Sequence, residues 1–465
     1  GNFDMKFCAV ILAAGRGKRM NSLKPKVLHE VLGRPILQYT LDAVKTLNPA
    51  KIVIVIGSGA EEVRKRINDE AISFVIQEKL LGTGNALAEA KNALIGIEDS
   101  TIVVLNGDSP LITAETLEGL LKKHKNDKNY FSFLSFIDDS VSGYGRVLRD
   151  KNGKVISIVE DKHTTSENRS IKELNGGVYA MEPDILNCLS RLKKHGSSGE
   201  YYITDIVDIA SKLGKRVNTY NCPSREIRGI NTRAELHQVS EILNSKIISE
   251  WMKKGVTFIS SAATLVHPSV SIGKDTIIYP NTYLEGNTSI GKNCIIYPGA
   301  RICDSVLGNG VLVKDCTVIE NSKIEDMSTI GPFAHLRPHS TLGRNVKIGN
   351  FVELKKAVIG DNTKASHLSY LGDAIVGENV NIGAGTITCN YDGQKKHITK
   401  IDSDVFVGSD SQLVAPVTIG KGAYVAAGAT VIKNVPPGAL AISRVKQRNI
   451  ENWAKKRNAK FKMQK

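Results

Sequence analysis

A segment near the N-terminus combines small residues and bases at a spacing that suits phosphate binding. Leu12-Ala13-Ala14-Gly15 is followed by Arg19, and Lys26 comes seven positions later. Glycine and alanine leave successive backbone N–H groups free to face an anion, and the two bases add positive charge. The segment matches neither the GxxxxGK[ST] P-loop nor the GxGxxG dinucleotide loop. A glycine turn with solvated charges remains an equal alternative on this segment alone.

A second cluster, Asn106-Gly107-Asp108, directly follows another apolar run. An aspartate at the tip of a buried strand can hold Mg²⁺ through one carboxylate, while phosphate oxygens and water complete the shell. Taken alone, such a tripeptide is more often only a turn.

The C-terminal half carries residue types that suit acyl transfer to an amine. That reaction needs a base for the ammonium proton, an oxyanion donor, and cations if the acceptor is anionic. The candidates, which gather where the local sequence pattern is least regular, are Arg337, Lys355, His367, Tyr370 and Asn381. A single histidine is more often a surface residue, and Cys389 opens a covalent alternative.

Apolar runs alternate with helix-like segments in the first 230 residues. The runs are Lys6–Leu12 (KFCAVIL), Ile52–Ile56 and Ile102–Leu105, and the helix-like segments include 36–47 and 61–67. This alternation predicts a Rossmann-like α/β domain on a mostly parallel sheet. Ligands of such domains bind beyond the carboxyl ends of the strands, where both N-terminal clusters fall.

From Val266 to Val431 an aliphatic residue recurs at nearly every sixth position. The first series is Val266, Ile272, Ile278, Leu284, Ile290, Ile296 and Ile302, and steps of five then lead to Leu307 and Ile324. Neither a helix nor a single strand repeats every six residues. Short strands joined by regular corners do, so the pattern predicts an all-β left-handed parallel β-helix of hexapeptide repeats. The period breaks at 389–400, which predicts a loop that leaves the wall.

A helical stretch separates the two patterns. Between Thr232 and Lys254, apolar residues recur every three or four positions, and Gly255 is expected to end the helix. We therefore expect a nucleotide-binding domain at 5–231, beginning at the plausible initiator Met5, a linker helix at 232–255, and a β-helix domain at 256–465. Its last residues form a basic tail that we interpret as solvated.

Composition limits the classes of partner. The chain has 62 Lys+Arg against 47 Asp+Glu, a net charge of +15, which suits anionic partners such as phosphorylated small molecules. No nucleic-acid-binding motif accompanies the charge. The seven scattered cysteines show neither a CxxC pair nor zinc spacing, and no apolar stretch approaches the ~20 residues that span a bilayer. We expect a soluble cytoplasmic protein with free thiols that binds no nucleic acid and is not inserted in a membrane.

Taken together, the motifs are far more specific than any one of them. The order LAAGRGKRM, KPK, Gln77 before Gly82-Thr83, Asn106-Gly107-Asp108, GYGR around Gly145, Glu160, Asn175, EYYITD and Asn231 resembles the sugar-1-phosphate nucleotidyltransferases. With the hexapeptide repeats, the chain from Met5 to about Asn452 resembles the bacterial bifunctional N-acetylglucosamine-1-phosphate uridyltransferase / glucosamine-1-phosphate acetyltransferase family.

For the N-terminal domain, the resemblance implies Mg²⁺-dependent transfer of uridyl from UTP to N-acetylglucosamine-1-phosphate. Arg19 and Lys26 would be catalytic, and Asp108 and Asn231 would ligate Mg²⁺. The residues implied for binding UTP or the UDP-sugar are Leu12, Ala13, Ala14, Gly15, Lys26, Gln77, Gly82, Thr83, Asn106, Gly107, Asp108, Gly145, Glu160, Asn175 and Asn231. Gln77 would offer a donor and an acceptor to the uracil edge. Asn106 departs from the aromatic residue that the family often has before Gly-Asp.

For the β-helix, the resemblance implies acetyl transfer from acetyl-CoA to glucosamine-1-phosphate. His367 would be the general base, and Arg337, Lys355, Tyr370 and Asn381 would hold the sugar phosphate. Acetyl-CoA would contact Ala384, Asn390, Tyr391, Ser409, Ala427 and Arg444. His339 departs from the glycine that the family often has after Arg-Pro. The family also points to a homotrimer.

Two other functions compete with this interpretation. One is a single-activity nucleotidyltransferase whose β-helix only oligomerises the chain, and the other is a non-catalytic regulatory scaffold. The intact set His367, Lys355, Arg337 and Arg444 argues against the first, and the intact set Arg19, Lys26 and Asp108 argues against the second.

Overall fold

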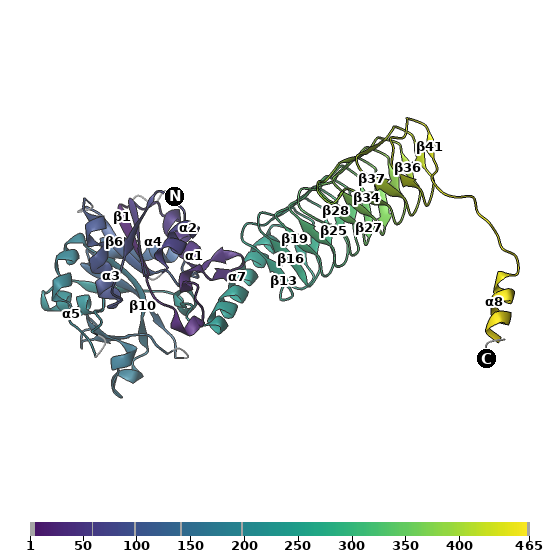
Figure 1. The fold of residues 1–465 in the computed structure, drawn as a ribbon. Coiled ribbons are helices and arrows are strands. Elements are labelled where there is room, and N and C mark those ends of the chain that lie inside the picture. The colour runs from purple at the N-terminus through teal and green to yellow at the C-terminus, as the bar shows by residue number, and fades with distance from the viewer. Residues whose placement is uncertain (1–4, 58, 97–98, 140–141, 197–198, 463–465) are drawn as a thin grey trace. The chain divides into compact units, whose positions relative to one another are not determined.

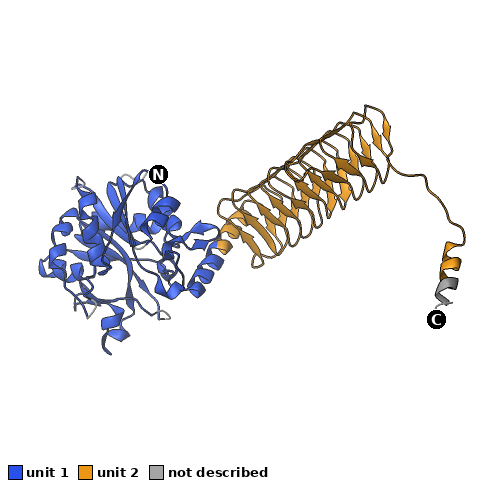
Figure 2. Cartoon of the chain, viewed as in Figure 1, with its two compact units in different colours: residues 1–243 blue, residues 244–465 orange. Residues whose placement is uncertain are grey.

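The computed structural model describes residues 5–462, except 58, 97–98, 140–141 and 197–198; the last residues of the expected β-helix domain, 463–465, therefore lie outside the described part. The chain forms two compact units, Gly1–Leu243 and Asn244–Lys465 (Figure 2). The division falls inside helix α7 (Arg233–Lys253), so the two halves of this helix belong to different units.

Unit 1 is built on a nine-stranded sheet in the order β11-β7-β10-β6-β1-β4-β5, with β8 paired to β10 and β9 to β8 (Figure 1). The strands are β1 (Phe7–Ala13), β4 (Lys51–Ile56), β5 (Ile72–Ile76), β6 (Thr101–Asn106), β7 (Phe131–Ile137), β8 (Arg146–Arg149), β9 (Val155–Val159), β10 (Glu173–Met181) and β11 (Val217–Asn221). Strands β5, β4, β1 and β6 are parallel, and β10 runs antiparallel to β6 and β7. The predicted α/β fold is confirmed. A two-stranded ribbon of β2 (Glu30–Val31) and β3 (Arg34–Pro35) is separate from the sheet.

Helices cover both faces of this sheet, which explains why its strands are apolar without alternation. The helices are α1 (Ile36–Thr46), α2 (Ala60–Arg66), α3 (Thr83–Ala90), α4 (Ala114–Asn126), α5 (Asp205–Lys212) and α6 (Ser224–Ile227). In β1, Ile11 faces a core shared with α1, α2 and α4, whereas Val10 faces a core shared with α3 and α5. Both side chains are fully buried.

The carboxyl ends of β1, β4 and β6 meet at one edge of the sheet. Residue Leu12 pairs with Asn106, and Ala13 pairs with Ile56. The backbone N–H of Gly107 donates to Leu12 O at 2.9 Å. At the opposite edge of the sheet, β1, β6, β7 and β11 begin side by side, and the antiparallel strand β10 ends there.

Unit 2 is a parallel β-helix of three sheets with eleven, ten and nine strands (Figure 1). The first contains β12 (Thr257–Phe258), β15 (Ile277–Ile278), β18 (Ile295–Ile296), β21 (Leu312–Val313), β24 (Thr329–Ile330), β27 (Lys347–Asn350), β30 (Lys364–His367), β33 (Asn381–Ile382), β36 (Phe406–Val407), β39 (Tyr424–Val425) and β41 (Leu440–Ala441). The second contains β13 (Thr264–Val266), β16 (Thr282–Glu285), β19 (Arg301–Cys303), β22 (Val318–Glu320), β25 (His335–Leu336), β28 (Glu353–Lys355), β31 (Tyr370–Gly372), β34 (Ile387–Cys389), β37 (Gln412–Val414) and β40 (Thr430–Val431). The third contains β14 (Ser271–Ile272), β17 (Ser289–Ile290), β20 (Val306–Leu307), β23 (Lys323–Ile324), β26 (Thr341–Leu342), β29 (Val358–Ile359), β32 (Ala374–Val376), β35 (Thr399–Ile401) and β38 (Val417–Ile419).

The six-residue period is the period of one flat side of this left-handed β-helix. Every aliphatic residue of the predicted series from Val266 to Ile302 is buried and belongs to one continuous core. Ile278 pairs with Ile296 one coil later, and Ile296 pairs with Val313. The steps of five therefore mark coils of 17 rather than 18 residues. Between β32 and β35 the register advances by 25 positions, because residues 390–398 leave the wall. The loop is shorter than the predicted 389–400, since Cys389 ends β34 and Thr399 begins β35.

The last coil is finished by side chains from the chain that follows β41. The Thr430 N–H donates to Ser443 Oγ at 2.6 Å, and this hydroxyl donates to Thr430 O at 2.7 Å. Farther on lies helix α8 (Trp453–Lys462). All seven cysteines are free thiols. Of the helices that the structure describes, none combines the length and apolar character needed to cross a membrane.

Helix α7 begins and ends with capping motifs that its sequence encodes. Thr232 Oγ1 accepts from the Glu235 N–H at 3.2 Å, and the Glu235 carboxylate accepts from the Thr232 N–H at 2.8 Å, which is a capping box. At the other end Gly255, with φ +90°, donates to Met252 O at 3.0 Å. A left-handed glycine of this kind terminates a helix.

Candidate functional sites

The carboxyl edge of the unit 1 sheet is hollowed into a cavity of about 750 Å³. Most residues predicted for nucleotide chemistry line it: Leu12, Ala13, Ala14, Gly15, Arg19, Lys26, Gln77, Gly82, Thr83, Asn106 and Asp108. Arg16, Lys18 and Glu200 line it as well. Segments from five places in the sequence therefore surround this one cavity, and basic side chains outnumber acidic ones in its lining.

Lys26 joins the phosphate-loop region to the predicted metal ligands. Its ammonium forms an ion pair with Asp108 Oδ2 and donates to Asn231 Oδ1 at 3.1 Å. Both side chains of the ion pair are largely buried, at 12% and 16% exposure. The Ile230 N–H donates to Asp108 O at 2.9 Å, which holds the segment before α7 against the end of β6.

This donor set fits Mg²⁺, because a carboxylate and an amide oxygen converge on one small cation, the Lys26 ammonium. Such hard oxygen ligands are the ones that Mg²⁺ uses, together with water and substrate phosphates. Among the described residues no group of three or more His, Cys, Asp or Glu side chains could hold a metal ion.

Two glycines of the cavity occupy positions that a side chain could not. Gly17 has φ +58°, and a Cβ there would lie 2.6 Å from Lys26 Cβ. Gly82 has φ +91°, and its Cβ would lie 2.5 Å from Tyr201 O. The absence of a side chain at Gly17 lets Lys26 pack against the loop after β1. The absence of a side chain at Gly82 lets the start of α3 pack against the 201–204 segment.

Gln77 is buried, and its amide group is already partly committed. Nε2 donates to Gly82 O at 3.2 Å and to Asn85 Oδ1 at 2.7 Å. Both amide hydrogens are used, so only Oε1 can face a base edge. In this geometry Oε1 remains as an acceptor for one ring N–H, while Nε2 could donate to a base only by exchanging one of its present partners.

Gly145, Glu160 and Asn175 come together on the β8–β10 side of the sheet. The Asn175 N–H donates to Gly145 O at 2.8 Å, and Asn175 Nδ2 donates to Tyr179 Oη at 2.9 Å. Thr204 Oγ1 donates to Glu160 Oε1 at 2.7 Å. Burial raises the pKa of Glu160, and the hydrogen bond from Thr204 opposes that rise. These residues do not line the 750 Å³ cavity itself.

In unit 2, His367 lies at the end of β30 and is held by the coil below. Its Nδ1 lies 2.8 Å from Asn350 Oδ1, and Asn350 and His367 are register partners. If Nδ1 donates to the amide oxygen, the neutral imidazole presents an unprotonated Nε2. That nitrogen could accept a proton from a substrate.

The other predicted sugar-phosphate residues lie on neighbouring coils. Arg337 Nη1 donates to Glu353 Oε1 at 3.0 Å, and Glu353 pairs in register with Tyr370. Lys355 occupies the last position of β28 beside Gly372 of β31. Asn381 begins β33 and pairs with Lys364 of β30. His339, with φ +68°, adopts the left-handed corner conformation without a glycine.

The 390–398 loop adds a second lysine to this cluster. Contact with Lys355, and the charge of Lys355, lower the pKa of Lys396. Asn390 Nδ2 donates to Asp373 Oδ2 at 2.5 Å and lies 3.5 Å from Tyr370 Oη. Two adjacent ammonium groups raise the local positive potential, which would favour an anionic ligand.

The residues predicted for acetyl-CoA fall into two places. Ala384, Ser409 and Ala427 follow one corner of the β-helix, because the Asp410 N–H donates to Ala384 O at 2.7 Å and the Gly428 N–H donates to Ser409 O at 2.8 Å. Arg444 joins this column through a hydrogen bond from Nη1 to Ala427 O at 2.5 Å. The Gly385 N–H donates to Leu368 O, so the column continues to the residue after His367. Asn390 and Tyr391 lie in the loop.

Three residues of these clusters were not predicted from the sequence. Lys396 lies in the loop that the broken period revealed, yet nothing in the sequence places it beside Lys355. Asp373 orients Asn390, and Asn350 orients His367. The only sequence signal for Asn350 is its distance of 17 residues from His367, one coil of the β-helix.

Comparison with known proteins agrees with this division. Residues 9–138 match the family model of the MobA-like NTP transferase domain. Residues 261–340 match that of the GMPPB C-terminal domain, and residues 398–433 match the six-repeat bacterial transferase hexapeptide model.

Full-length relatives share the whole arrangement. A bifunctional protein GlmU of Thermodesulfovibrio yellowstonii is 49% identical over 96% of this chain and 99% of its own. Proteins of the same name from Clostridium botulinum and Halalkalibacterium halodurans are 42% and 44% identical, each over 97% of this chain and at least 98% of their own. This identity over nearly the full length shows that the chain belongs to the bifunctional GlmU proteins, the uridyltransferase and acetyltransferase family that its motifs resemble.

Proposed function

We propose that the unit 1 cavity is the uridyltransferase site of this bifunctional enzyme and that the His367 cluster is its acetyltransferase site. The observation that carries the first assignment is the convergence of Lys26, Asp108 and Asn231 at the end of β6. The observation that carries the second is the Asn350–His367 pair beside two adjacent lysines.

In uridyl transfer, a phosphate oxygen of N-acetylglucosamine-1-phosphate attacks the α-phosphorus of UTP in line, and pyrophosphate leaves. No protein nucleophile is needed, so the side chains position the reactants and offset charge. Backbone N–H groups of 12–15 and the bases Arg19 and Lys26 would face the phosphates. Gln77 Oε1 would accept from the uracil ring N–H, and Gly145, Glu160 and Asn175 would hold the sugar.

Mg²⁺ would be held by Asp108 and Asn231, and when bound it would neutralise charge on the phosphate oxygens. The Lys26 ammonium now occupies the space between these two ligands. Lys26 would then turn toward the phosphates, where a flexible four-carbon side chain can reach.

In acetyl transfer, His367 Nε2 would take a proton from the amine of glucosamine-1-phosphate. The amine nitrogen then attacks the thioester carbonyl of acetyl-CoA, a C–N bond forms, the C–S bond breaks, and the leaving thiolate takes the further proton that the nitrogen loses on forming the amide. The sugar phosphate would lie against Arg337, Lys355, Tyr370 and Asn381. Acetyl-CoA would follow the column Ala384, Ser409, Ala427 and Arg444 and the loop residues Asn390 and Tyr391, so no covalent role for Cys389 is required.

A homotrimer would complete the acetyltransferase site. Beside His367, the corner carries Leu368, Phe351 and Phe333 at 59%, 57% and 51% exposure. The two phenylalanine rings stack with centroids 5.5 Å apart. A continuous exposed apolar row of this kind is typical of a protein interface. Flat β-helix sides suit closed threefold association, in which a neighbour would cover the row and exclude water from the reaction.

Single substitutions should separate the two activities, because the clusters lie in different units. We expect His367→Ala to lower acetyl transfer by about 10²–10⁴-fold, the usual contribution of a general base, and to leave uridyl transfer near wild type. Asp108→Ala should do the reverse. The measurement is the rate of each half-reaction in each purified variant, with circular dichroism to verify folding. Loss of both activities in both folded variants would refute the two-site assignment.

A further inference from the structure

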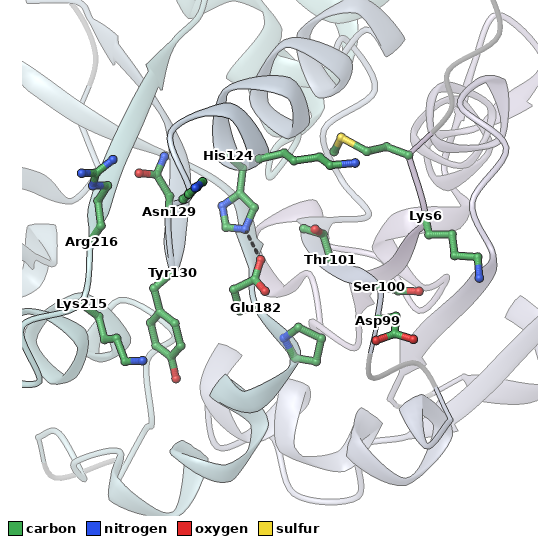
Figure 3. Close-up of a pocket in the computed structure, with 14 residues that line it drawn as sticks. Lys6, Asp99, Ser100, Thr101, His124, Asn129, Tyr130, Glu182, Lys215 and Arg216 are labelled. Carbon is green, nitrogen blue, oxygen red and sulfur yellow. Dashed lines mark hydrogen bonds and ion pairs between the residues drawn. The ribbon is translucent and has the colours of Figure 1, made fainter.

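A second large cavity lies at the edge of the unit 1 sheet opposite the uridyltransferase site. It has a volume of about 870 Å³ and is lined by residues at the starts of β1, β6 and β7, at the end of β10 and just before β11. Figure 3 shows His124 and Glu182 between a group formed by Tyr130, Lys215 and Arg216 and another that contains Lys6 and Asp99. Strand β6 has six residues, so the two edges are about 15–20 Å apart. A ligand here would not touch the substrates of uridyl transfer.

The wall of this cavity is strongly basic. Lys6, Lys125, Lys128, Lys215 and Arg216 line it, against only two carboxylates, Asp99 and Glu182. In the described part of the chain, no ion pair engages Lys6, Lys125 or Lys128. The Lys215 ammonium lies 5.0 Å from the centroid of the Tyr130 ring, a cation–π contact that does not neutralise it. The excess charge indicates an anionic ligand.

The C-terminal end of α4 forms one side of the cavity, and backbone hydrogen bonds fix its conformation. Lys128 has φ +49°, its N–H donates to Lys125 O at 3.0 Å, and the Asn129 N–H donates to His124 O at 2.9 Å. This Schellman turn engages two of the carbonyls at the end of the helix, which would otherwise repel an anion. It also fixes Lys125, Lys128 and Asn129 on one rim.

A buried chain of polar groups leads from this turn to Glu182. Burial lowers the pKa of His124, which is 1% exposed, so the ring is neutral. Its Nε2 lies 3.1 Å from Glu182 Oε1 and its Nδ1 lies 2.9 Å from Ser132 Oγ. The carboxylate can only accept, so Nε2–H donates to it and Nδ1 accepts from the Ser132 hydroxyl. Ser132 Oγ in turn accepts from Asn129 Nδ2 at 3.0 Å.

One polar atom of this hydrogen-bonded chain, the side-chain oxygen of Asn129, has no partner among the described residues. Asn129 is 2% exposed and lines the cavity, yet its Oδ1 is buried without a hydrogen-bond partner among the described residues. A buried acceptor without a donor costs about 1–3 kcal/mol. A ligand hydroxyl or amino group in the cavity could supply the missing donor.

We propose that this cavity is a binding site for a small organic phosphate, separate from both catalytic sites. The phosphate would lie among Lys6, Lys125, Lys128, Lys215 and Arg216, and a hydroxyl or amino group of the same molecule would donate to Asn129 Oδ1. The charge excess selects the phosphate, and the unpaired amide oxygen selects a molecule that also carries a donor.

Isothermal titration of the full-length protein with glucose 6-phosphate tests the charge requirement. The double variant Lys128→Glu/Lys215→Glu reverses two charges of the cavity, and the matched control Lys65→Glu/Lys151→Glu reverses two exposed charges elsewhere in unit 1. Any binding at the catalytic sites is common to all three proteins. We expect the cavity variant alone to lose at least ten-fold in affinity at one class of site, with uridyl transfer unchanged. No binding to the wild type, or equal binding to the cavity variant, would overturn the proposal.

Methyl phosphate tests the donor requirement, because it has the same charge but no hydroxyl or amino group. We expect it to bind the cavity about ten-fold more weakly than glucose 6-phosphate does, the loss that one hydrogen bond would produce. Equal affinities for methyl phosphate, inorganic phosphate and glucose 6-phosphate would show a plain anion site and would overturn the assignment to an organic phosphate.

Discussion

At the scale of single residues, the hydrogen bonds of Gln77 and His367 determine which atoms of the two proposed sites remain available to a ligand. In unit 1 the amide hydrogens of Gln77 are used by Gly82 O and Asn85, so its oxygen is the group left for a base. In unit 2 the Asn350 oxygen accepts from His367 Nδ1, so Nε2 is the nitrogen left for a substrate. In each case a hydrogen bond to a neighbouring residue determines which atom of the side chain is available to a ligand.

Asn350 is therefore a positioning residue, and its removal should slow acetyl transfer without weakening substrate binding. We expect Asn350→Ala to lower kcat by about ten-fold, as the loss of one hydrogen bond to the base predicts, with an unchanged KM for glucosamine-1-phosphate. Asn350→Asp restores the acceptor and should recover much of the rate. An unchanged kcat in Asn350→Ala would show that the imidazole needs no such support.

The sequence suggested residues that would touch substrates, but it did not suggest the residues that would orient them. His367, Lys355 and Tyr370 are embedded in motifs whose order is specific, so roles could be proposed for them. Asn350 and Lys396 act through contacts across coils or from a loop, and no local pattern records such a contact. The same holds for Asn129, whose unpaired oxygen is visible only once the end of α4 has been placed.

At the scale of elements, Glu173 of β10 ties three strands together. Its carboxylate accepts from Arg149 of β8 at 2.7 Å through both Nε and Nη2, and Arg149 Nη2 also donates to Thr219 of β11 at 2.8 Å. Burial is the largest single effect on this carboxyl and would raise the pKa of Glu173, but the hydrogen bonds from Arg149, Ser135 and Thr219 and the charge of Arg149 together lower it.

A lowered pKa means that this pair stabilises the folded state above about pH 4.5 and loses its effect as the pH falls through the folded pKa. We expect Glu173→Gln to lower the free energy of unfolding by about 1 kcal/mol at pH 7, with little difference from wild type near pH 3. Urea denaturation at both pH values measures this. A difference that is constant with pH would exclude a contribution from the charge.

The β-helix depends on a different kind of element, the single inward aliphatic side chain of each short strand. Ile324 of β23 is 1% exposed, while its neighbour Lys323 points outward. We expect Ile324→Ala to lower the free energy of unfolding by about 2–5 kcal/mol, because it leaves a cavity in a continuous core. Lys323→Ala should change it by less than about 0.5 kcal/mol. Denaturant midpoints of the two variants give the comparison.

The elements of unit 2 could be predicted almost coil by coil, whereas those of unit 1 could be predicted only in part. A six-residue period follows directly from the geometry of the β-helix wall, so most of the inward aliphatic positions are visible in the sequence. Strands β7 and β10 have no comparable signature, since both of their faces are covered and their pairing joins residues far apart in the chain. Helices α1 and α2 were visible, but α3 to α5 were not singled out.

At the scale of the whole molecule, the division between the two compact units falls inside α7. Ile248, in the second half of this helix, is 1% exposed and belongs to the β-helix core, and Ile247 and Trp251 pack against that core. The first half begins at the capping box beside Asn231. A chain cut at Lys254 would therefore expose apolar side chains that a chain cut at Leu243 would lack.

We expect a chain ending at Leu243 to be a soluble monomer that keeps uridyl transfer, because every residue proposed for that site precedes it. The full-length protein should be a trimer by light scattering, and a chain ending at Lys254 should aggregate more readily than the shorter one. A folded 1–243 chain without uridyl transfer would show that the site needs unit 2. A monomeric full-length protein with full acetyltransferase activity would refute the interface site.

The hydrogen bonds that finish the last coil have a consequence for solubility. A stack of parallel strands ends in unpaired N–H and C=O groups, and an open edge of this kind is a template on which another chain can add. Here the Ser443 hydroxyl forms hydrogen bonds with both the N–H and the C=O of Thr430, and Arg444 donates a hydrogen bond to Ala427 O. Arg444, which is proposed to bind acetyl-CoA, thus also covers part of the exposed backbone at the end of the β-helix. We therefore expect the segment after β41 to hinder end-to-end association of one β-helix with another.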